Sequence, residues 1–167
     1  MEPQTTHVAL AVKTSPKDFF LHLLSMVALY ASAVSFLMIV FSLINVYFPD
    51  VAQQNLYDQV SSLRDSIRGS LSSLIVFFPV FLVVTSLLNK SYHTFPEKRN
   101  LGVRKWLIYF TLFVGALVMM GYLVSAIYGL LGGELTLPFS LKVLSIFFVA
   151  GSIFVYYLSD IKKHGTE

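Results

Sequence analysis

Four long apolar runs, separated by short polar stretches, constrain what this chain can fold into. The runs cover residues 19–48, 69–89, 105–131 and 137–158. About 20 consecutive apolar residues are enough for a helix to cross the hydrocarbon core of a bilayer. The runs therefore predict an all-α integral membrane bundle of four transmembrane helices.

The composition agrees with a membrane protein rather than a soluble one. The chain has 167 residues, of which 56% are hydrophobic and only 13% are charged, whereas about a quarter of a soluble domain is charged. A chain this short must expose much of its surface, so lipid replaces water over much of it. The absence of cysteine excludes disulfides, thiolate metal ligands and thiol nucleophiles.

The expected organisation is one membrane domain, residues 17–163, between a cytoplasmic tail, 1–16, and a short cytoplasmic end, 164–167. A cleaved signal peptide is an alternative for the first run, because lysines precede it and the small residues 31–33 lie within it. The run continues without charge to Phe48, far beyond the apolar region of a signal peptide. A retained helix is therefore expected.

An amphipathic helix is expected over residues 51–68, before the second run. Leu56, Val60, Leu63 and Ile67 recur at the spacing of one helical face, and the opposite side is charged. We expect this helix to lie outside the membrane and to continue into the second span. Its apolar face can lie on lipid headgroups or pack on the bundle, and the sequence favours neither.

Basic residues predict the orientation of the bundle. The stretch Asn89–Trp106 is a strongly basic break in the apolar chain. Together with the two ends of the chain it places nine Lys and Arg residues on one side of the predicted membrane, against three on the other. The positive-inside rule assigns the larger group, and with it both termini, to the cytoplasm. The nine are Lys13, Lys17, Lys90, Lys98, Arg99, Arg104, Lys105, Lys162 and Lys163, and the three are Arg64, Arg68 and Lys142.

Two helical faces carry small residues at intervals of three and four. Such faces let helices approach closely in lipid, where association depends on packing and interhelical hydrogen bonds. We expect the two faces to contact each other, within one chain or between chains; alternatively, the serines bond only their own backbone carbonyls. The first face is formed by Ser25, Ala28, Ser32, Ser35 and Ser42, with Ile39 completing the spacing, and the second by Gly121, Ser125 and Gly129.

A charged residue and a proline within the spans are further candidate functional residues. Lys142 lies about one turn into the fourth span, where its long side chain can reach the headgroups or pair with Glu134 or Asp50. An ion or substrate site at Lys142 and Glu134 is the alternative. Pro79 interrupts the second span and predicts a kink, which either shapes packing or forms a hinge or pocket.

No pattern indicates a cofactor, a metal or catalysis. A haem held by two histidines needs two imidazoles facing each other, and His22 is the sole histidine in a predicted span. Neither a metalloprotease motif nor a phosphate-binding loop is present. The basic residues flank apolar runs, which favours membrane anchoring and contact with anionic lipid headgroups over nucleic-acid binding.

An ordered set of short motifs runs through residues 16–163. The motifs are Phe48-Pro49-Asp50, Leu74-Ile75-Val76-Phe77-Phe78-Pro79-Val80-Phe81, Val103-Arg104-Lys105-Trp106-Leu107, Gly133-Glu134-Leu135 with Lys142, and Tyr156-Tyr157-Leu158-Ser159-Asp160. In this order they resemble the bacterial membrane proteins grouped as domain of unknown function family 5671. The resemblance implies a four-helix protein of the bacterial inner membrane and supplies no activity, cofactor or catalytic residue.

We expect a non-enzymatic accessory or assembly subunit that binds other membrane helices, in partners or in a second copy of itself. The two small-residue faces and the lack of catalytic motifs support this interpretation. A small transporter or channel component, with Pro79, Glu134 and Lys142 near its path, is the alternative. A protein that handles lipid or quinone is a third possibility.

Overall fold

A computed structural model describes residues 15–48, 56–94, 102–132 and 136–164. These residues form four helices: α1, Pro16–Tyr47; α2, Leu56–Thr94; α3, Gly102–Leu131; and α4, Leu137–His164. No strand occurs in the described ranges. The fold is therefore all-α, as the apolar runs predict.

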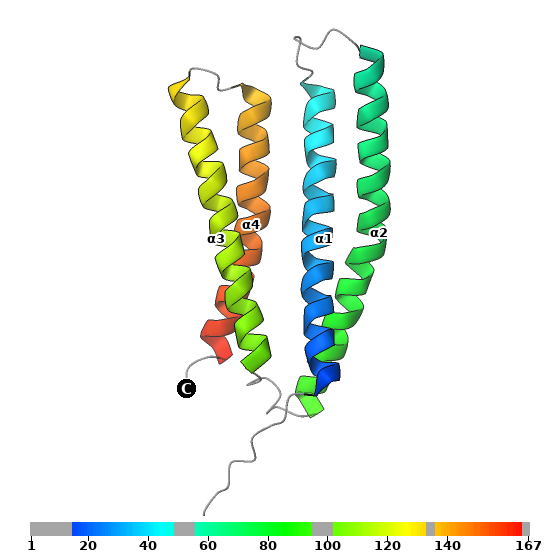
Figure 1. Ribbon diagram of the computed structural model, residues 1–167, viewed down its shortest axis with the longest axis vertical. Helices are drawn as coiled ribbons and strands as arrows, with labels where there is room; N and C mark the ends of the chain where they lie inside the picture. Colours follow the sequence, from blue (N-terminus) through cyan, green and yellow to red (C-terminus); the bar gives the residue numbers. More distant parts are fainter. Residues whose placement is uncertain (1–14, 49–55, 95–101, 133–135, 165–167) are drawn as a thin grey trace, which may run out of the picture.

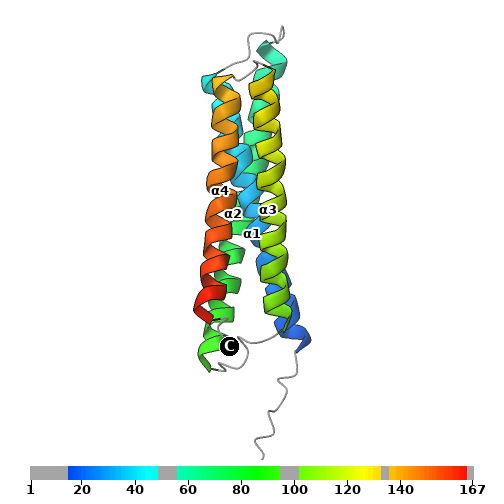
Figure 2. The ribbon, with the colours of Figure 1, turned by 90° about the vertical axis from the view of Figure 1, so that its left-hand side faces the viewer.

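The four helices run alternately up and down (Figures 1 and 2). Helix α1 packs along α2, α3 packs along α4, and the two pairs meet where α1 contacts α4 and, over a shorter stretch, α3. We call the end where α1 and α3 begin and α2 and α4 finish the Arg104 end. The opposite end, where α4 begins, is the Lys142 end.

All four helices are long and apolar enough to cross a membrane. Helices α2, α3 and α4 contain the whole of the predicted spans, and α1 ends one residue before the predicted limit. Pro16 and Pro138 stand in the first turns of α1 and α4, where a missing amide hydrogen breaks no helical bond.

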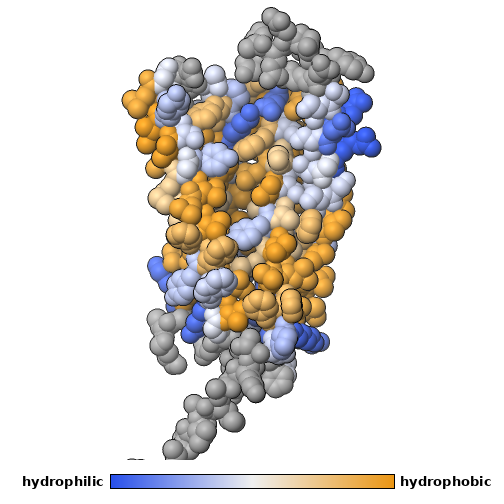
Figure 3. All heavy atoms as spheres, viewed as in Figure 1, coloured by the Kyte–Doolittle hydropathy of each residue, from blue (hydrophilic) through white to orange (hydrophobic). Residues whose placement is uncertain are grey.

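The predicted outer helix and the second span form one continuous helix. The 39 residues of α2 are about 58 Å long at 1.5 Å per residue, roughly twice the thickness of the hydrocarbon core. Its first turns carry the exposed Arg64, Asp65 and Arg68. Figure 3 shows hydrophilic side chains along this upper part of α2 and hydrophobic ones over the middle of the same face. Residues 51–55 of the predicted amphipathic segment lie outside the described ranges.

The distribution of side chains is the reverse of that in a soluble bundle. Large apolar residues face outward, among them Val124 and Phe148, which are 67% and 72% exposed. Buried residues include many polar ones: Asp18, His22, Ser25, Ser32, Ser35, Ser42 and Thr111. Because lipid is as apolar as these outward side chains, the bundle is built for a bilayer.

Pro79 lies inside α2, as predicted, and its own side chain is exposed. A proline in a helix removes one backbone hydrogen bond and clashes with the preceding turn. Figure 1 shows α2 changing direction in its lower half, towards α1. This bend brings the last turns of α2 against the first turns of α1.

Candidate functional site

A row of polar side chains connects all four helices at the Arg104 end. His22 of α1 bonds Tyr92 of α2 through Nε2 and the hydroxyl, 2.5 Å apart. The Arg104 guanidinium of α3 lies 5.2 Å from the centre of the Tyr92 ring, within cation–π distance. Arg104 Nη2 also donates to Asp160 Oδ2 of α4 at 2.5 Å. We call these four residues the polar clasp.

The hydrogen bonds of His22 determine which ring nitrogen carries the proton. Nδ1 lies 2.6 Å from the backbone carbonyl oxygen of Asp18, and a carbonyl only accepts, so Nδ1 donates. In the neutral ring Nε2 then accepts from the Tyr92 hydroxyl. His22 and Tyr92 are both buried, and their bond joins the start of α1 to the end of α2.

Arg104 and Asp160 form an ion pair that is largely shielded from solvent. Their side chains are 13% and 27% exposed. A charge held at this depth is costly unless an opposite charge and hydrogen bonds compensate it. The pair meets that condition and joins the first turn of α3 to the last turns of α4.

The antiparallel connection of the helices explains why these residues meet. A short connection between two helices places the start of one beside the end of the other. Arg104 is therefore level with Asp160, and His22 is level with Tyr92. The contacts of α1 with α3 and α4 then bring the two pairs together.

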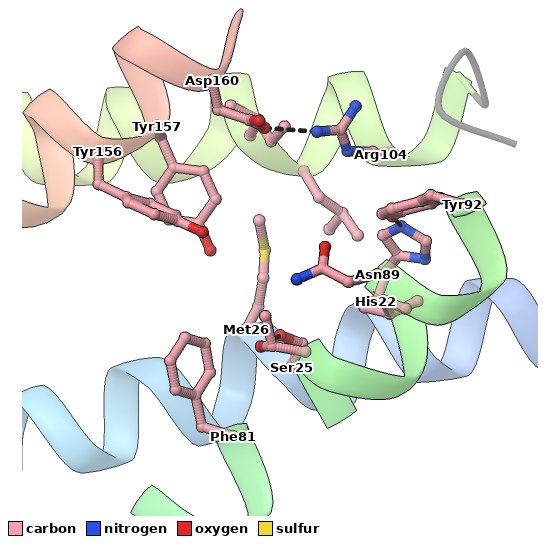
Figure 4. A pocket seen from close by; sticks show the side chains of 14 residues that line it. His22, Ser25, Met26, Phe81, Asn89, Tyr92, Arg104, Tyr156, Tyr157 and Asp160 are labelled. Carbon is pink, nitrogen blue, oxygen red and sulfur yellow. Dashed lines mark hydrogen bonds and ion pairs between the residues drawn. The ribbon is translucent and has the colours of Figure 1, made fainter. Parts of the chain in front are cut away.

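A cavity of about 90 Å³ lies between the four helices beside the polar clasp. Figure 4 shows Tyr156 and Tyr157 reaching into it from α4, opposite Phe81 and Asn89 of α2. Its lining is partly polar and partly apolar. The remaining lining residues are His22, Ser25, Met26, Thr85, Leu88, Tyr92, Arg104, Leu107, Ile108 and Asp160.

The structure places the small-residue face of α1 in the interior, mainly against α2. Ser25 lies 3.3 Å from Thr85 and Ser42 lies 3.4 Å from Ser66, in each case between hydroxyl oxygens. Ala28, Ser32 and Ser35 are also buried, and Ile39 is half-buried. Ser32 donates to the carbonyl of Ala28 at 2.7 Å, so the face both packs between helices and bonds its own backbone.

The small-residue face of α3 points away from the bundle. Gly121 and Ser125 are exposed, and a Cβ at Gly121 would meet no atom within 4 Å. Ser125 donates to the carbonyl of Gly121. The described structure does not bring this face against the small-residue face of α1. Instead Ser125 and Gly129 line a hollow with Phe139 of α4.

Of the residues predicted for a site around Lys142, the structure describes Lys142 alone. Lys142 is half-buried on α4, at the end opposite the polar clasp. Its predicted partners, Glu134 and Asp50, lie outside the described ranges. Residues 95–101 of the basic loop also lie outside them. Within the described helices there is no cluster of three His, Cys, Asp or Glu side chains that would hold a metal.

In the sequence, the four residues of the polar clasp carry separate signals. Arg104 counted towards topology, Asp160 was the last residue of a family motif and His22 was the sole histidine in a predicted span. The sequence nevertheless contains a signal for the pairing of Arg104 with Asp160. A charge inside the membrane boundary needs a partner, and the antiparallel order places Asp160 at the same level as Arg104.

The fold and these sites define a multi-pass membrane protein with four spanning helices, a polar interior and an apolar exterior. The model of the family described as a domain of unknown function (DUF5671) matches residues 18–157. The chain belongs to that family, and its molecular activity is not established by that membership. Searches among curated proteins and among solved structures yield no significant match.

Proposed function

We propose that the protein is a non-enzymatic accessory or assembly subunit of the bacterial inner membrane that binds a further membrane helix. The exposed small-residue face of α3 carries this proposal. Its Gly121 and Ser125 make no close contact with another helix in the described chain, while the corresponding face of α1 is buried. A surface suited to close helix packing is thus left uncovered.

The shape of this surface supports the proposal. Ser125 and Gly129 line a hollow together with the larger Val124, Tyr128 and Phe139. Small residues let two helix backbones approach, and the gain in van der Waals contact drives association in lipid. A helix from a partner protein or from a second copy would fill the hollow better than flexible lipid tails.

Native mass spectrometry after gentle extraction tests this role. We expect the wild-type chain to retain a second protein chain, and Gly121→Leu or Gly129→Leu to lose it, because leucine holds the incoming helix away. Gly151→Leu is the matched control, since Gly151 on α4 also has no atom within 4 Å of an added Cβ. Retention of the partner in both α3 variants, or a wild-type chain that is always alone, would contradict the proposal.

The proposed orientation puts the Arg104 end and both termini in the cytoplasm. Lys17, Lys90 and Lys105 are exposed at this end, as the positive-inside rule requires. Each such cation near an anionic lipid surface contributes about 1 kcal/mol of attraction. Contact with anionic headgroups thereby helps to hold the bundle in register with the bilayer.

A transporter is less well supported by the geometry. Pro79 is exposed on α2 and Lys142 lies at the end opposite the polar cavity. The residues that line the cavity all lie towards the Arg104 end. Among the described residues, those assigned to a transport path therefore do not line one common route.

A further inference from the structure

The cavity beside the polar clasp has the size of a binding site for a small chemical group. Its volume of about 90 Å³ exceeds the roughly 10–15 Å³ that one water needs. It is far below the ~300 Å³ of sites that enclose a whole drug-sized ligand. The cavity therefore suits a group of a few heavy atoms rather than an entire molecule.

The cavity opens sideways, between α2 and α4. In the described part of the chain, the backbone of α2 lies close to that of α1 but not to those of α3 and α4, although the Tyr92 side chain of α2 reaches Arg104 of α3. Asn89 of α2 and Tyr156 of α4 line the cavity, and both are exposed. Figure 4 shows them on its two sides. A molecule in the bilayer can reach the cavity along this opening with its remainder still in lipid.

The depth of the cavity is that of the boundary between headgroups and hydrocarbon. It lies next to Arg104, in the first turn of α3, and Asp160, near the end of α4. Trp106 is exposed close by on α3, and tryptophan favours this boundary. The polar head of a membrane amphiphile is at the same level.

The lining offers hydrogen bonds without a net charge. The Arg104 charge is balanced by Asp160 at 2.5 Å. The Asn89 amide and the Tyr157 hydroxyl belong to residues that line the cavity, and Ser25 and Thr85 are joined by one long bond of 3.3 Å. An anionic head would bring a further negative charge beside Asp160 into a site whose Arg104 cation is already paired, whereas an uncharged, oxygen-bearing head would not.

We propose that this cavity binds the small, uncharged, hydroxyl- or carbonyl-bearing head of a membrane amphiphile, whose apolar tail leaves between α2 and α4. Asn89 and Tyr157 supply hydrogen bonds to the head, and Met26, Phe81 and Leu88 contact its apolar part. This site is separate from the hollow on α3 and does not depend on the proposed helix partner.

Thermal unfolding of the purified full chain in detergent tests the proposal. The probes are dioctanoylglycerol and a short-chain quinone, both uncharged, and dioctanoyl phosphatidic acid, which has the same tails as the first but an anionic head. We expect a saturable rise in Tm with at least one uncharged probe and a much weaker one with the anionic probe. The uncharged probe that acts identifies the type of head.

Variants of the lining residues test whether the rise in Tm comes from binding in the cavity. Tyr157→Phe and Asn89→Leu each remove hydrogen-bonding groups, and we expect the half-saturating concentration to rise about 5- to 10-fold. Tyr109→Phe and Asn45→Leu are matched controls outside the cavity lining. Equal stabilisation by charged and uncharged probes, stabilisation by none, or unchanged binding in both cavity variants would overturn the proposal.

Discussion

At the residue scale, the polar clasp is the feature that the sequence does not reveal. His22, Tyr92, Arg104 and Asp160 come from four helices and are far apart along the chain. Each has an ordinary explanation when considered alone, as a helix end, an interfacial aromatic or a topology signal. Their shared location follows only from the order and direction of the helices. The same holds for the cavity, which all four helices line.

Breaking one partner of the ion pair should destabilise the bundle. Arg104→Leu or Asp160→Leu leaves the other charge in a poorly solvated place. Because the pair is partly exposed, we expect a loss of about 1–3 kcal/mol in the free energy of unfolding, below the value for fully buried pairs. Denaturation of the detergent-solubilised variants by sodium dodecyl sulfate, followed by circular dichroism, measures this loss.

The double variant separates a true pair from two independent contributions. Arg104→Leu with Asp160→Leu should be more stable than the sum of the single losses predicts, because no unpaired charge remains. Asp65→Asn, at an exposed site on α2, is the control and should change stability little. Simple additivity of the two single variants would show that Arg104 and Asp160 are not coupled.

At the scale of the helices, the spacing of small residues identifies a face but not its partner. The spacing of Ser25, Ala28, Ser32, Ser35 and Ser42 marks one side of α1, and the structure buries that side. Its main partner is α2, which offers the hydroxyls of Ser66 and Thr85. Partner choice depends on which helices a short connection brings together, and periodicity does not contain that information.

A larger side chain on the buried face of α1 should separate it from its neighbours. Ala28 is 0% exposed, so Ala28→Leu forces extra atoms into a filled space and should cost about 1–3 kcal/mol. Val34→Leu, at a residue of α1 that is 55% exposed, should have almost no effect. Thermal unfolding in the same detergent compares the two, and equal Tm values would show that α1 is not tightly packed at Ala28.

At the scale of the whole molecule, the apolar runs were sufficient to predict the architecture. Length and hydrophobicity alone determine whether a helix can span the bilayer, and each predicted span lies within one helix, apart from Phe48, one residue beyond the end of α1. Helix ends were less predictable. Polar residues such as Lys90, Thr94 and Asp160 continue α2 and α4 beyond the apolar core, because a helix need not end where the hydrocarbon does.

Cysteine accessibility in intact cells most directly tests the central claim, a four-span bundle with the Arg104 end in the cytoplasm. The chain has no cysteine, so Thr94→Cys and Thr136→Cys each introduce one thiol at an exposed residue, at the Arg104 end and the Lys142 end respectively. A membrane-impermeant maleimide should label Thr136→Cys in intact cells and Thr94→Cys only after permeabilisation. Labelling of both residues from the same side, or the reverse order, would contradict the account.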